Sequence, residues 1–214
     1  MTVAAAGTEL ATRAALMAAG ERLFAEHGLG AVSNRQIAEA AGRRNVTAVS
    51  YHFGGRTGLL RAIMTEHGER VDRIRERHVR AVGDSSALRD WVGCLVRPVP
   101  EHLAELGSPS WNARFSVQVM ADPALRSLVT EEALSRPWLR RVLDGLHHCL
   151  AELPADVRQV RGGMGRHLIT QICAERERAL AEGGSDRHGS WERTADALTD
   201  AITGLLTAPV TPRA

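Results

Sequence analysis

The sequence predicts an all-α fold, and its composition is the first reason. Aromatic residues make up only 4% of the 214 residues, whereas Ala, Leu, Arg and Glu are abundant. Alternating runs of β-branched residues, which sandwiches and barrels need, do not occur. With 44% hydrophobic and 24% charged residues, the chain has the composition of a globular protein with one substantial core or two small ones, and disordered and collagen-like classes are excluded.

Helical spacing of apolar residues is the second reason, and it is clearest near the N-terminus. Leu16, Gly20, Leu23 and Phe24 recur three or four positions apart, with charged residues between them. Gly28 supplies a stop signal, since glycine readily adopts the left-handed conformation that ends a helix. We therefore expect a first amphipathic helix that ends just before Gly28.

Two short helices follow in the prediction, joined by a tight turn. Ser33 stands three residues before Gln36, the spacing of a capping box, and this predicts a short second helix. Gly42 ends that helix, and Asn45 is a favourable N-cap for a third helix over residues 46–53.

A long helix is expected to begin at Arg56 and to end near Gly83. Proline and glycine clusters then divide the rest of the chain into further helices, for a total of nine or ten and no strands. We therefore expect a first helical domain at residues 1–55, a second helical domain at 56–207, and a tail at 208–214.

The arrangement of the first three helices is that of a helix-turn-helix unit, in which the third helix lies in the major groove of DNA. All 27 basic residues of the chain are Arg against 25 acids, so the overall charge of +2 does not indicate a nucleic-acid partner. The local charge does, because residues 35–56 hold four Arg and a single acid, Glu39. A polar helical hairpin without DNA binding is the competing interpretation.

A set of spaced residues in the same region forms a recognisable pattern: Arg13, Ala18-Ala19, Leu23-Phe24, Gly28, Ser33, Ile37-Ala38, Ala40-Ala41-Gly42, Tyr51-His52-Phe53, Arg56 and Leu59-Leu60. In these residues the region resembles the N-terminal domain of the tetracycline-repressor (TetR) family of bacterial transcriptional regulators. The resemblance implies a homodimeric regulator with its DNA-binding domain at residues 1–55 and a regulatory domain at 56–207 that dimerises and binds an effector. One extra residue between Gly42 and Phe53, and Arg43-Arg44 in place of an apolar residue and Ser, depart from the common family pattern.

The DNA-contacting residues are predicted to have different tasks. Arg44, Thr47 and Ala48 lie at the leading end of the third helix, where base edges are read. Tyr51 and His52 match the backbone-contacting pair of the family, and Arg56 is placed to bind a phosphate at the next helix start. The full predicted set is Ser33, Arg35, Arg44, Asn45, Thr47, Ala48, Ser50, Tyr51, His52 and Arg56.

Two further sites are predicted in the C-terminal part. Large apolar side chains between residues 91 and 146 are mostly core, and by the resemblance a subset lines an effector cavity with a few polar groups. By the resemblance, two heptad-like apolar stripes form a two-fold four-helix interface, and we favour this interpretation over an intramolecular core. The predicted cavity residues are Trp91, Leu95, Trp111, Phe115, Gln118, Trp138 and His147, and the predicted interface residues are Met164, Leu168, Ile172, Leu198, Ile202 and Leu205.

Other functional classes have little support. Three scattered cysteines suggest neither a disulfide framework nor a metal site, and adjacent His147 and His148 point about 100° apart on a helix, so we expect no metal and no cofactor. No secretory or membrane segment is predicted, which favours a cytoplasmic protein. The leading hypothesis is a repressor that binds a pseudo-palindromic double-stranded operator and is released by a small-molecule effector. The alternative is an all-helical enzyme or small-molecule carrier, although no catalytic motif appears.

Overall fold

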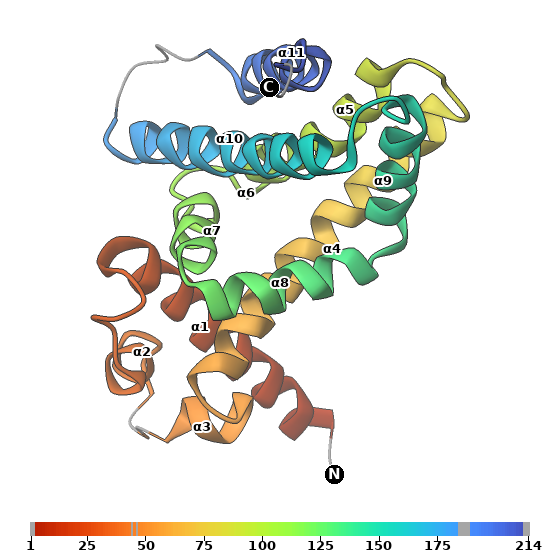
Figure 1. Cartoon of the computed structure of the whole chain (residues 1–214). Helices are drawn as coiled ribbons and strands as arrows, with labels where there is room; N and C mark the ends of the chain where they lie inside the picture. Colours follow the sequence, from red (N-terminus) through yellow and green to blue (C-terminus); the bar gives the residue numbers. More distant parts are fainter. Residues whose placement is uncertain (1–2, 44, 46, 184–188, 212–214) are drawn as a thin grey trace.

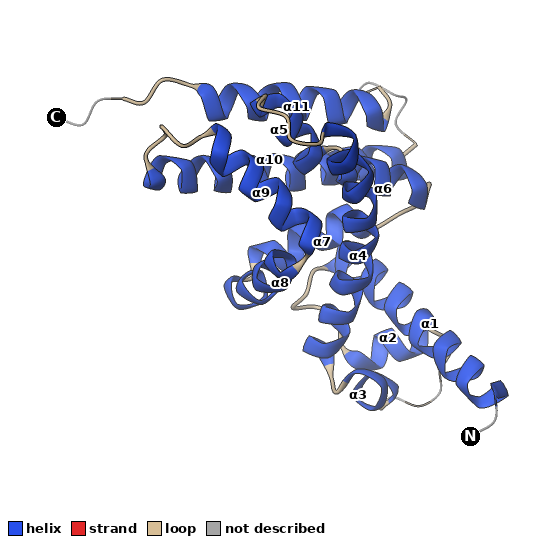
Figure 2. Cartoon of the chain, turned by 90° about the vertical axis from the view of Figure 1, so that its right-hand side faces the viewer, coloured by secondary structure: helices blue, strands red, loops and turns tan. Residues whose placement is uncertain are grey.

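The computed structural model describes residues 3–43, 45, 47–183 and 189–211, of which the side chains of residues 3–6 are left out (Figures 1 and 2). Within these residues it consists of eleven helices and no strand, which confirms the all-α prediction and exceeds the predicted nine or ten helices. Pro98, Pro123 and Pro137 each stand in the first turn of a helix that begins almost directly after the previous one. Proline is tolerated in a first turn because its missing N–H has no partner there, so these residues start helices as well as end them.

The first three helices form a small module at one end of the molecule (Figure 1). They are α1 (Val3–His27), α2 (Asn34–Ala40) and α3 (Ala48–Phe53). Leu16, Phe24, Ile37, Val49 and Leu59 are buried together where these helices meet the next one. The capping box predicted at the start of α2 is confirmed. The Gln36 N–H donates a hydrogen bond to the Ser33 hydroxyl, and the Ser33 N–H donates one to the side-chain oxygen of Gln36.

Helix α4 (Arg56–Val82) runs from this module into the rest of the chain without a break, as predicted. Figure 1 shows it crossing the molecule diagonally, with α3 at its N-terminal end. Gly58, in its first turn, lies directly against the end of α3. A Cβ atom built on Gly58 would overlap the carbonyl oxygen of Phe53, so only glycine allows this approach of the two helices.

Seven helices follow α4 in the described part of the chain. They are α5 (Leu88–Val96), α6 (Pro98–Leu106), α7 (Asn112–Ala121), α8 (Pro123–Ser135), α9 (Pro137–Cys149), α10 (Ala155–Ala181) and α11 (Trp191–Thr207). Helices α5, α6, α8 and α9 pack against α4, whereas α10 packs against α7 and α11, and α11 packs against α5 and α6. Trp91, Val92, Val142 and Leu198 lie in the centre of a second hydrophobic core. Helices α10 and α11 lie side by side, far from α2 and α3 in both views (Figures 1 and 2).

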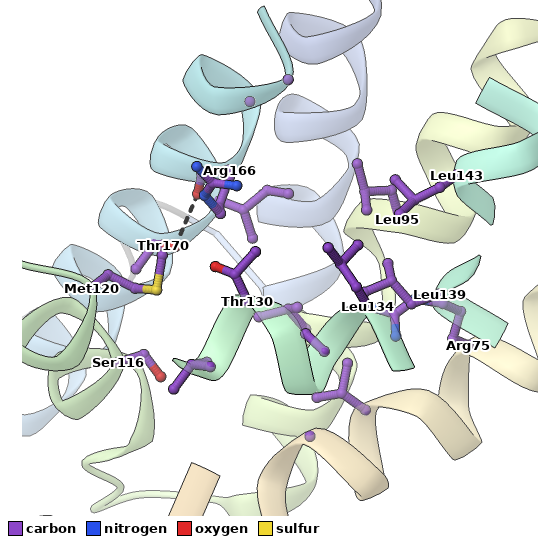
Figure 3. A pocket seen from close by; sticks show the side chains of 18 of the residues that line it. Arg75, Leu95, Ser116, Met120, Thr130, Leu134, Leu139, Leu143, Arg166 and Thr170 are labelled. Carbon is purple, nitrogen blue, oxygen red and sulfur yellow. Dashed lines mark hydrogen bonds between the residues drawn. The ribbon is translucent and has the colours of Figure 1, made fainter. Parts of the chain in front are cut away.

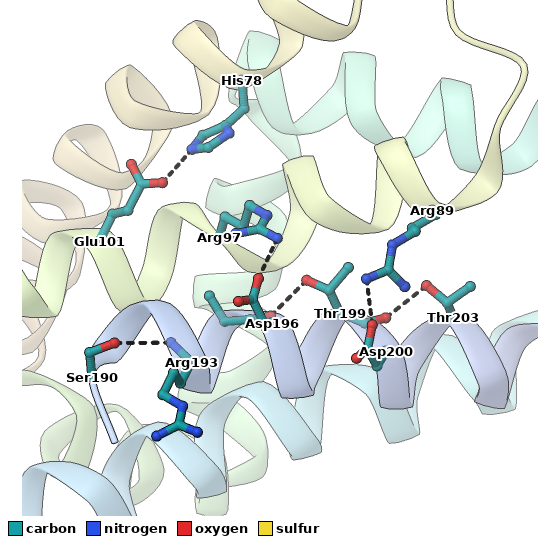
Figure 4. A network of polar contacts seen from close by, with 11 residues as sticks. His78, Arg89, Arg97, Glu101, Ser190, Arg193, Asp196, Thr199, Asp200 and Thr203 are labelled. Atoms are coloured by element: carbon teal, nitrogen blue, oxygen red, sulfur yellow. Dashed lines mark hydrogen bonds and ion pairs between the residues drawn. The ribbon is translucent and has the colours of Figure 1, made fainter. Parts of the chain in front are cut away.

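Helix α11 is fixed to α5 and to the residue between α5 and α6 by charged pairs on its outer side (Figure 4). Arg97 pairs with Asp196 at 2.6 Å, and Arg89 pairs with Asp200 at 2.5 Å. Because these groups are largely exposed to solvent, each pair contributes little stability, about 0–1 kcal/mol. Burial of Leu198 and Ile202 is therefore what holds α11 in place.

A buried carboxylate joins α10 to the start of α7. Glu177, 2% exposed, accepts hydrogen bonds at Oε1 from the Ser110 hydroxyl (2.9 Å) and the Ala113 N–H (3.1 Å). Its Oε2 accepts from the N–H and the Nε–H of Arg114 at 3.0 and 3.1 Å. Glu177 thus satisfies two of the free amide groups at the N-terminus of α7 and pairs with a cation.

Candidate functional site

The turn before α3 differs from the prediction in register. Asn45 Oδ1 accepts hydrogen bonds from the Thr47 N–H (2.9 Å) and the Thr47 hydroxyl (2.7 Å), and Thr47 occupies the N-cap position. The predicted start at residue 46 with Asn45 as N-cap is therefore wrong, since α3 begins at Ala48. Arg44, predicted to read bases, and Val46 lie outside the described residues.

The exposed face of α3 presents small polar and aromatic groups. Thr47 and Ser50 are exposed, as is the preceding Asn45, and Tyr51 is 79% exposed. Ala48, predicted to contact a base, is only 6% exposed and packs in the core of the module. This is a correction to the sequence prediction, and its cause is the register: Ala48 and Val49 point inward, so Thr47, Ser50 and Tyr51 point outward.

The C-terminal end of α3 is fixed to α1 by an arginine. Arg13 donates a hydrogen bond to the carbonyl oxygen of His52, and its guanidinium carbon lies 4.4 Å from the centre of the Phe53 ring. His52, predicted to contact the DNA backbone, is partly buried and its ring stands edge-on to Tyr51. Tyr51 is consequently the more accessible member of this predicted pair.

Arg56, the predicted phosphate ligand, is directed into the module. It donates a hydrogen bond to the carbonyl oxygen of Val32, and its guanidinium carbon lies 4.9 Å from the centre of the Phe24 ring. Partial burial lowers the pKa of Arg56 below its usual value. The side chain therefore supports the packing of the module, and a phosphate contact by Arg56 stays a prediction.

Helix α2 contributes the remaining predicted DNA contacts. Ser33 is exposed, but its hydroxyl serves the cap of α2. Arg35 is exposed and pairs with Glu39 one turn later at 2.8 Å, an arrangement that raises the pKa of Arg35. Ser33 and Arg35 belong to the same module as α3, and their contacts with DNA stay a prediction.

A cavity of about 420 Å³ lies among the helices of the C-terminal part (Figure 3). Of the predicted cavity residues, Leu95 and His147 line it and the other five do not. Trp91 is buried in the core, where Gly145 packs on its ring, and its indole N–H donates to the Ser85 carbonyl at 2.8 Å. The size of a side chain and its helical spacing do not distinguish a core residue from a residue of a cavity wall, which is why the prediction of these five residues is wrong.

The other four misplaced residues also have identifiable roles. Phe115 is fully buried and stacks on Phe24, with ring centres 6.1 Å apart, so it joins α7 to α1. Trp111 donates its indole N–H to Glu26 at 3.2 Å, and Gln118 lies beside Gly28. Trp138 packs at the edge of the second core beneath the guanidinium of Arg80. The lining residues that the sequence did not indicate include Arg75, Leu139 and Ile169.

A chain of polar contacts crosses from the N-terminal module to the C-terminal part beside this cavity. His67, which lines the cavity, places Nε2 3.0 Å from Glu21 Oε1 of α1 and Nδ1 2.8 Å from His102 Nε2 of α6. His102 is 1% exposed, and burial lowers its pKa to about 4, with smaller contributions from His67, Arg70 and Arg73. His102 is therefore neutral in the folded protein at neutral pH.

We expect stability to fall between pH 6.5 and pH 4 because of His102. Over this range the unfolded chain binds a proton at residue 102, whereas the folded chain excludes it. At about 1.4 kcal/mol per pKa unit, the loss reaches about 3 kcal/mol at the acidic end. Denaturant unfolding at several pH values measures it: His102→Gln should flatten the profile and the exposed control His148→Gln should not. An unchanged profile in His102→Gln contradicts the prediction.

The predicted interface residues divide into two groups. Met164, Leu168 and Ile172 are 48%, 37% and 38% exposed and, with Val160, form an apolar stripe along α10 that continues to the partly exposed Leu205 of α11. Leu198 and Ile202 are 3% and 1% exposed, because this face of α11 packs inside the chain. Their assignment to an interface is corrected: they belong to the intramolecular core.

Neither a metal site nor a membrane span is found in the part of the chain that the structure describes. Within the described ranges, no group of three or more His, Cys, Asp or Glu side chains is arranged to hold a metal ion. In the same part of the chain, none of the helices combines the length and the apolar character that crossing a bilayer requires.

Comparison with known proteins identifies the N-terminal module. Residues 16–63 match the model of the family described as bacterial regulatory proteins, tetR family. No curated protein matches the chain in sequence. Two similar crystal structures are a protein assigned to the TetR family of transcriptional regulators from Mesorhizobium loti and the TetR family transcriptional regulator PfmR from Thermus thermophilus. Each is 18% identical to this chain in sequence. The M. loti protein aligns with 92% of this chain at a TM-score of 0.48, and PfmR aligns with 93% at 0.49; both alignments cover 97% of the other protein.

Proposed function

We propose, from the premise that residues 16–63 match the tetR family of bacterial regulatory proteins, that the chain is a homodimeric repressor of this family, released from DNA by a small-molecule effector. Proteins of this family regulate transcription and are not enzymes. The observation that carries the proposal is the exposed, acid-free face of α3, formed by Thr47, Ser50 and Tyr51 in the matched region. This face supports major-groove reading by α3, with α2 beside it.

A change in α3 should alter which DNA sequence is preferred. Thr47→Ala removes an exposed hydroxyl and methyl from the leading end of α3, where base edges are read. The operator would be found by selection from random duplexes. Thr47→Ala should weaken binding to that operator by about 0.5–1.5 kcal/mol, the effect of one neutral hydrogen bond, and shift the preferred bases. Thr207→Ala, at the exposed end of α11, is the matched control and should change nothing.

Arg35→Gln should instead weaken binding to all sequences alike, since a phosphate contact carries no sequence information. Each lost phosphate contact reduces the slope of log affinity against log salt concentration by about 0.9. A dimer has two copies of Arg35, so the slope should decrease in magnitude by about two. Arg89→Gln, remote on α5, leaves the slope unchanged in this prediction. A shift of sequence preference in Arg35→Gln but none in Thr47→Ala would contradict the assignment of α3 as the recognition helix.

The apolar stripe of α10 supports the homodimer. A row of exposed Val160, Met164, Leu168 and Ile172 is unfavourable in water, and a two-fold partner covers it with its own copy of the same row. A dimer also presents two copies of α3 to one operator, which fits half-sites about 34–36 Å apart in a pseudo-palindrome.

Charges placed in the stripe should prevent dimerisation. Leu168→Glu together with Met164→Glu would bring four carboxylates near the two-fold axis without an available partner, so sedimentation at micromolar concentration should give a monomer with weaker operator binding. Leu10→Glu, which changes an exposed leucine of α1, is the control and should sediment like the unchanged protein. A monomeric unchanged protein would refute this part of the proposal.

The cavity supports the effector part. Its volume of about 420 Å³ lies within the usual range of small-molecule sites, and its wall is mostly apolar. His67 and Arg75 of α4 belong to that wall, and the same helix holds α3 at its other end. An effector that binds better to a conformation with a different spacing of the two α3 helices would lower operator affinity.

A further inference from the structure

Two residues of the cavity wall each carry a buried hydrogen-bond donor that the described residues do not satisfy. Arg75 of α4 is 5% exposed and its Nε–H has no partner, and Asn112 of α7 is 8% exposed and its Nδ2 has none. Among the described residues that line the cavity, these are the buried side-chain nitrogen and oxygen atoms without a partner. Both atoms are donors. A ligand that satisfies them must therefore supply acceptors.

Arg75 keeps part of its positive charge available despite a neighbouring carboxylate. Its Nη1 donates to Asp72 Oδ1 at 2.9 Å, but the same oxygen accepts the Leu139 N–H at 3.1 Å and Asp72 Oδ2 faces the Trp138 N–H at 3.4 Å. Asp72 thus also compensates the positive N-terminus of α9. In Figure 3 Arg75 lies beside Leu139, at the opposite side of the cavity from Met120 and Ser116.

The charges around the cavity are strongly unequal. The described lining residues include five arginines and a single carboxylate, Glu132, which pairs with Arg136 at 3.1 Å. Arg158 and Arg161 donate to main-chain carbonyl groups, and among the described residues no carboxylate forms an ion pair with either. A positive cavity of this kind attracts anions and repels cations. The five arginines are Arg75, Arg136, Arg158, Arg161 and Arg166.

The same wall is otherwise apolar. Leu95, Leu139, Leu143, Ile169 and Ile202 come from four different helices and enclose the space that Arg75 borders. A purely ionic ligand would leave this surface without a partner, and a purely apolar ligand would leave the Arg75 Nε–H unsatisfied. Only an amphipathic anion suits both parts of the wall.

We propose that the cavity binds a small apolar carboxylate, with its acid group on the Nε–H of Arg75 and its hydrocarbon body among the leucine and isoleucine side chains. The inference rests on the proposed function only in regarding this ligand as the effector. If the ligand carries a second oxygen atom, the side-chain amide of Asn112 donates a hydrogen bond to it.

A charge series of probes of equal chain length tests the ligand class on the unchanged full-length protein. Decanoate, decanol and decyltrimethylammonium differ in head-group charge and share an apolar chain, and calorimetry at pH 7.5 measures their affinities. Decanoate should bind about 10- to 100-fold more tightly than decanol, the effect of a hydrogen bond to a charged group, and the cation should bind least. No binding by any probe, or a cation that binds as tightly as decanoate, overturns the proposal.

Variants test the place of the acid group. The pair Asp72→Asn with Arg75→Gln removes both charges together, and Arg75→Lys keeps the charge but lacks the Nε–H. Each should reduce the advantage of decanoate over decanol to about threefold or less, while decanol binds as before. Arg77→Gln, on the exposed side of the same helix, is the control and keeps the full advantage. An undiminished advantage in the Arg75 variants overturns the assignment of Arg75.

Operator binding is measured separately with the same probes. Decanoate binding that leaves operator affinity unchanged supports the ligand class and refutes effector release. Operator binding by a protein that takes up no probe refutes the ligand class and leaves the DNA-binding function intact. The two failures are therefore distinguishable.

Discussion

Glu177→Ala should destabilise the protein by about 3–5 kcal/mol, the range for removing one partner of a buried charged pair. The change leaves the N–H groups of Ala113 and Arg114, the hydroxyl of Ser110 and the Arg114 guanidinium without their acceptor in a place that water reaches poorly. Urea unfolding of the full chain measures the loss. We expect the midpoint to fall without a change in slope.

Two variants define the cause of this loss. Glu177→Gln keeps one acceptor oxygen but turns an NH₂ group toward donors, so it should recover only part of the stability. Glu175→Ala, at an exposed position of the same helix, should change stability by less than about 0.5 kcal/mol. A loss below about 1 kcal/mol in Glu177→Ala would show that the carboxylate is not what joins α10 to α7.

Gly58→Ala should lower both stability and DNA affinity. The new Cβ overlaps the backbone carbonyl of Phe53, and backbone cannot rotate away as a flexible side chain can, so α3 must move relative to α4. Overpacking of this kind costs about 1–3 kcal/mol or more. Because α3 is the proposed recognition helix, operator affinity should fall at least about tenfold, equivalent to about 1.4 kcal/mol.

The control for Gly58→Ala is the same substitution in open space. Gly204, in α11, has no atom within 4 Å of a built Cβ, so Gly204→Ala should stabilise the protein by up to about 1 kcal/mol through helix propensity. Thermal unfolding and operator titration compare the two variants. Equal behaviour of Gly58→Ala and Gly204→Ala would contradict a tight contact between α3 and α4.

Local signals in the sequence predicted much of the fold. Ser33 and Gln36 form their predicted cap because both partners lie within one turn, and α4 begins at Arg56 and ends at Val82 because glycines flank it. The start of α3 was misplaced because Asn45 forms a turn with Thr47, a competitor of the N-cap that uses the same side-chain oxygen.

The candidate sites were less predictable because they depend on contacts between distant segments. Helical spacing marked Leu198 and Leu168 alike as apolar, but only the docking of α11 against α5 and α10 decides that Leu198 is covered and Leu168 is not. Arg75 gave no signal in the sequence, since an arginine on an amphipathic helix is most simply a solvated residue. Its burial results from the position of α9, which supplies the amide groups facing Asp72.

Because α4 is one continuous helix, a movement at one of its ends is transmitted to the other end. From Arg56, beside α3, to Arg75, in the cavity wall, the helix extends about 28 Å at about 1.5 Å per residue. A tilt of about 5° at the cavity would move the other end of such a rod by about 2.5 Å, and opposite movements in two protomers would change the α3 separation by about 5 Å. In the proposed dimer, a ligand that shifts one wall of the cavity slightly would therefore displace both α3 helices from the major grooves of one operator.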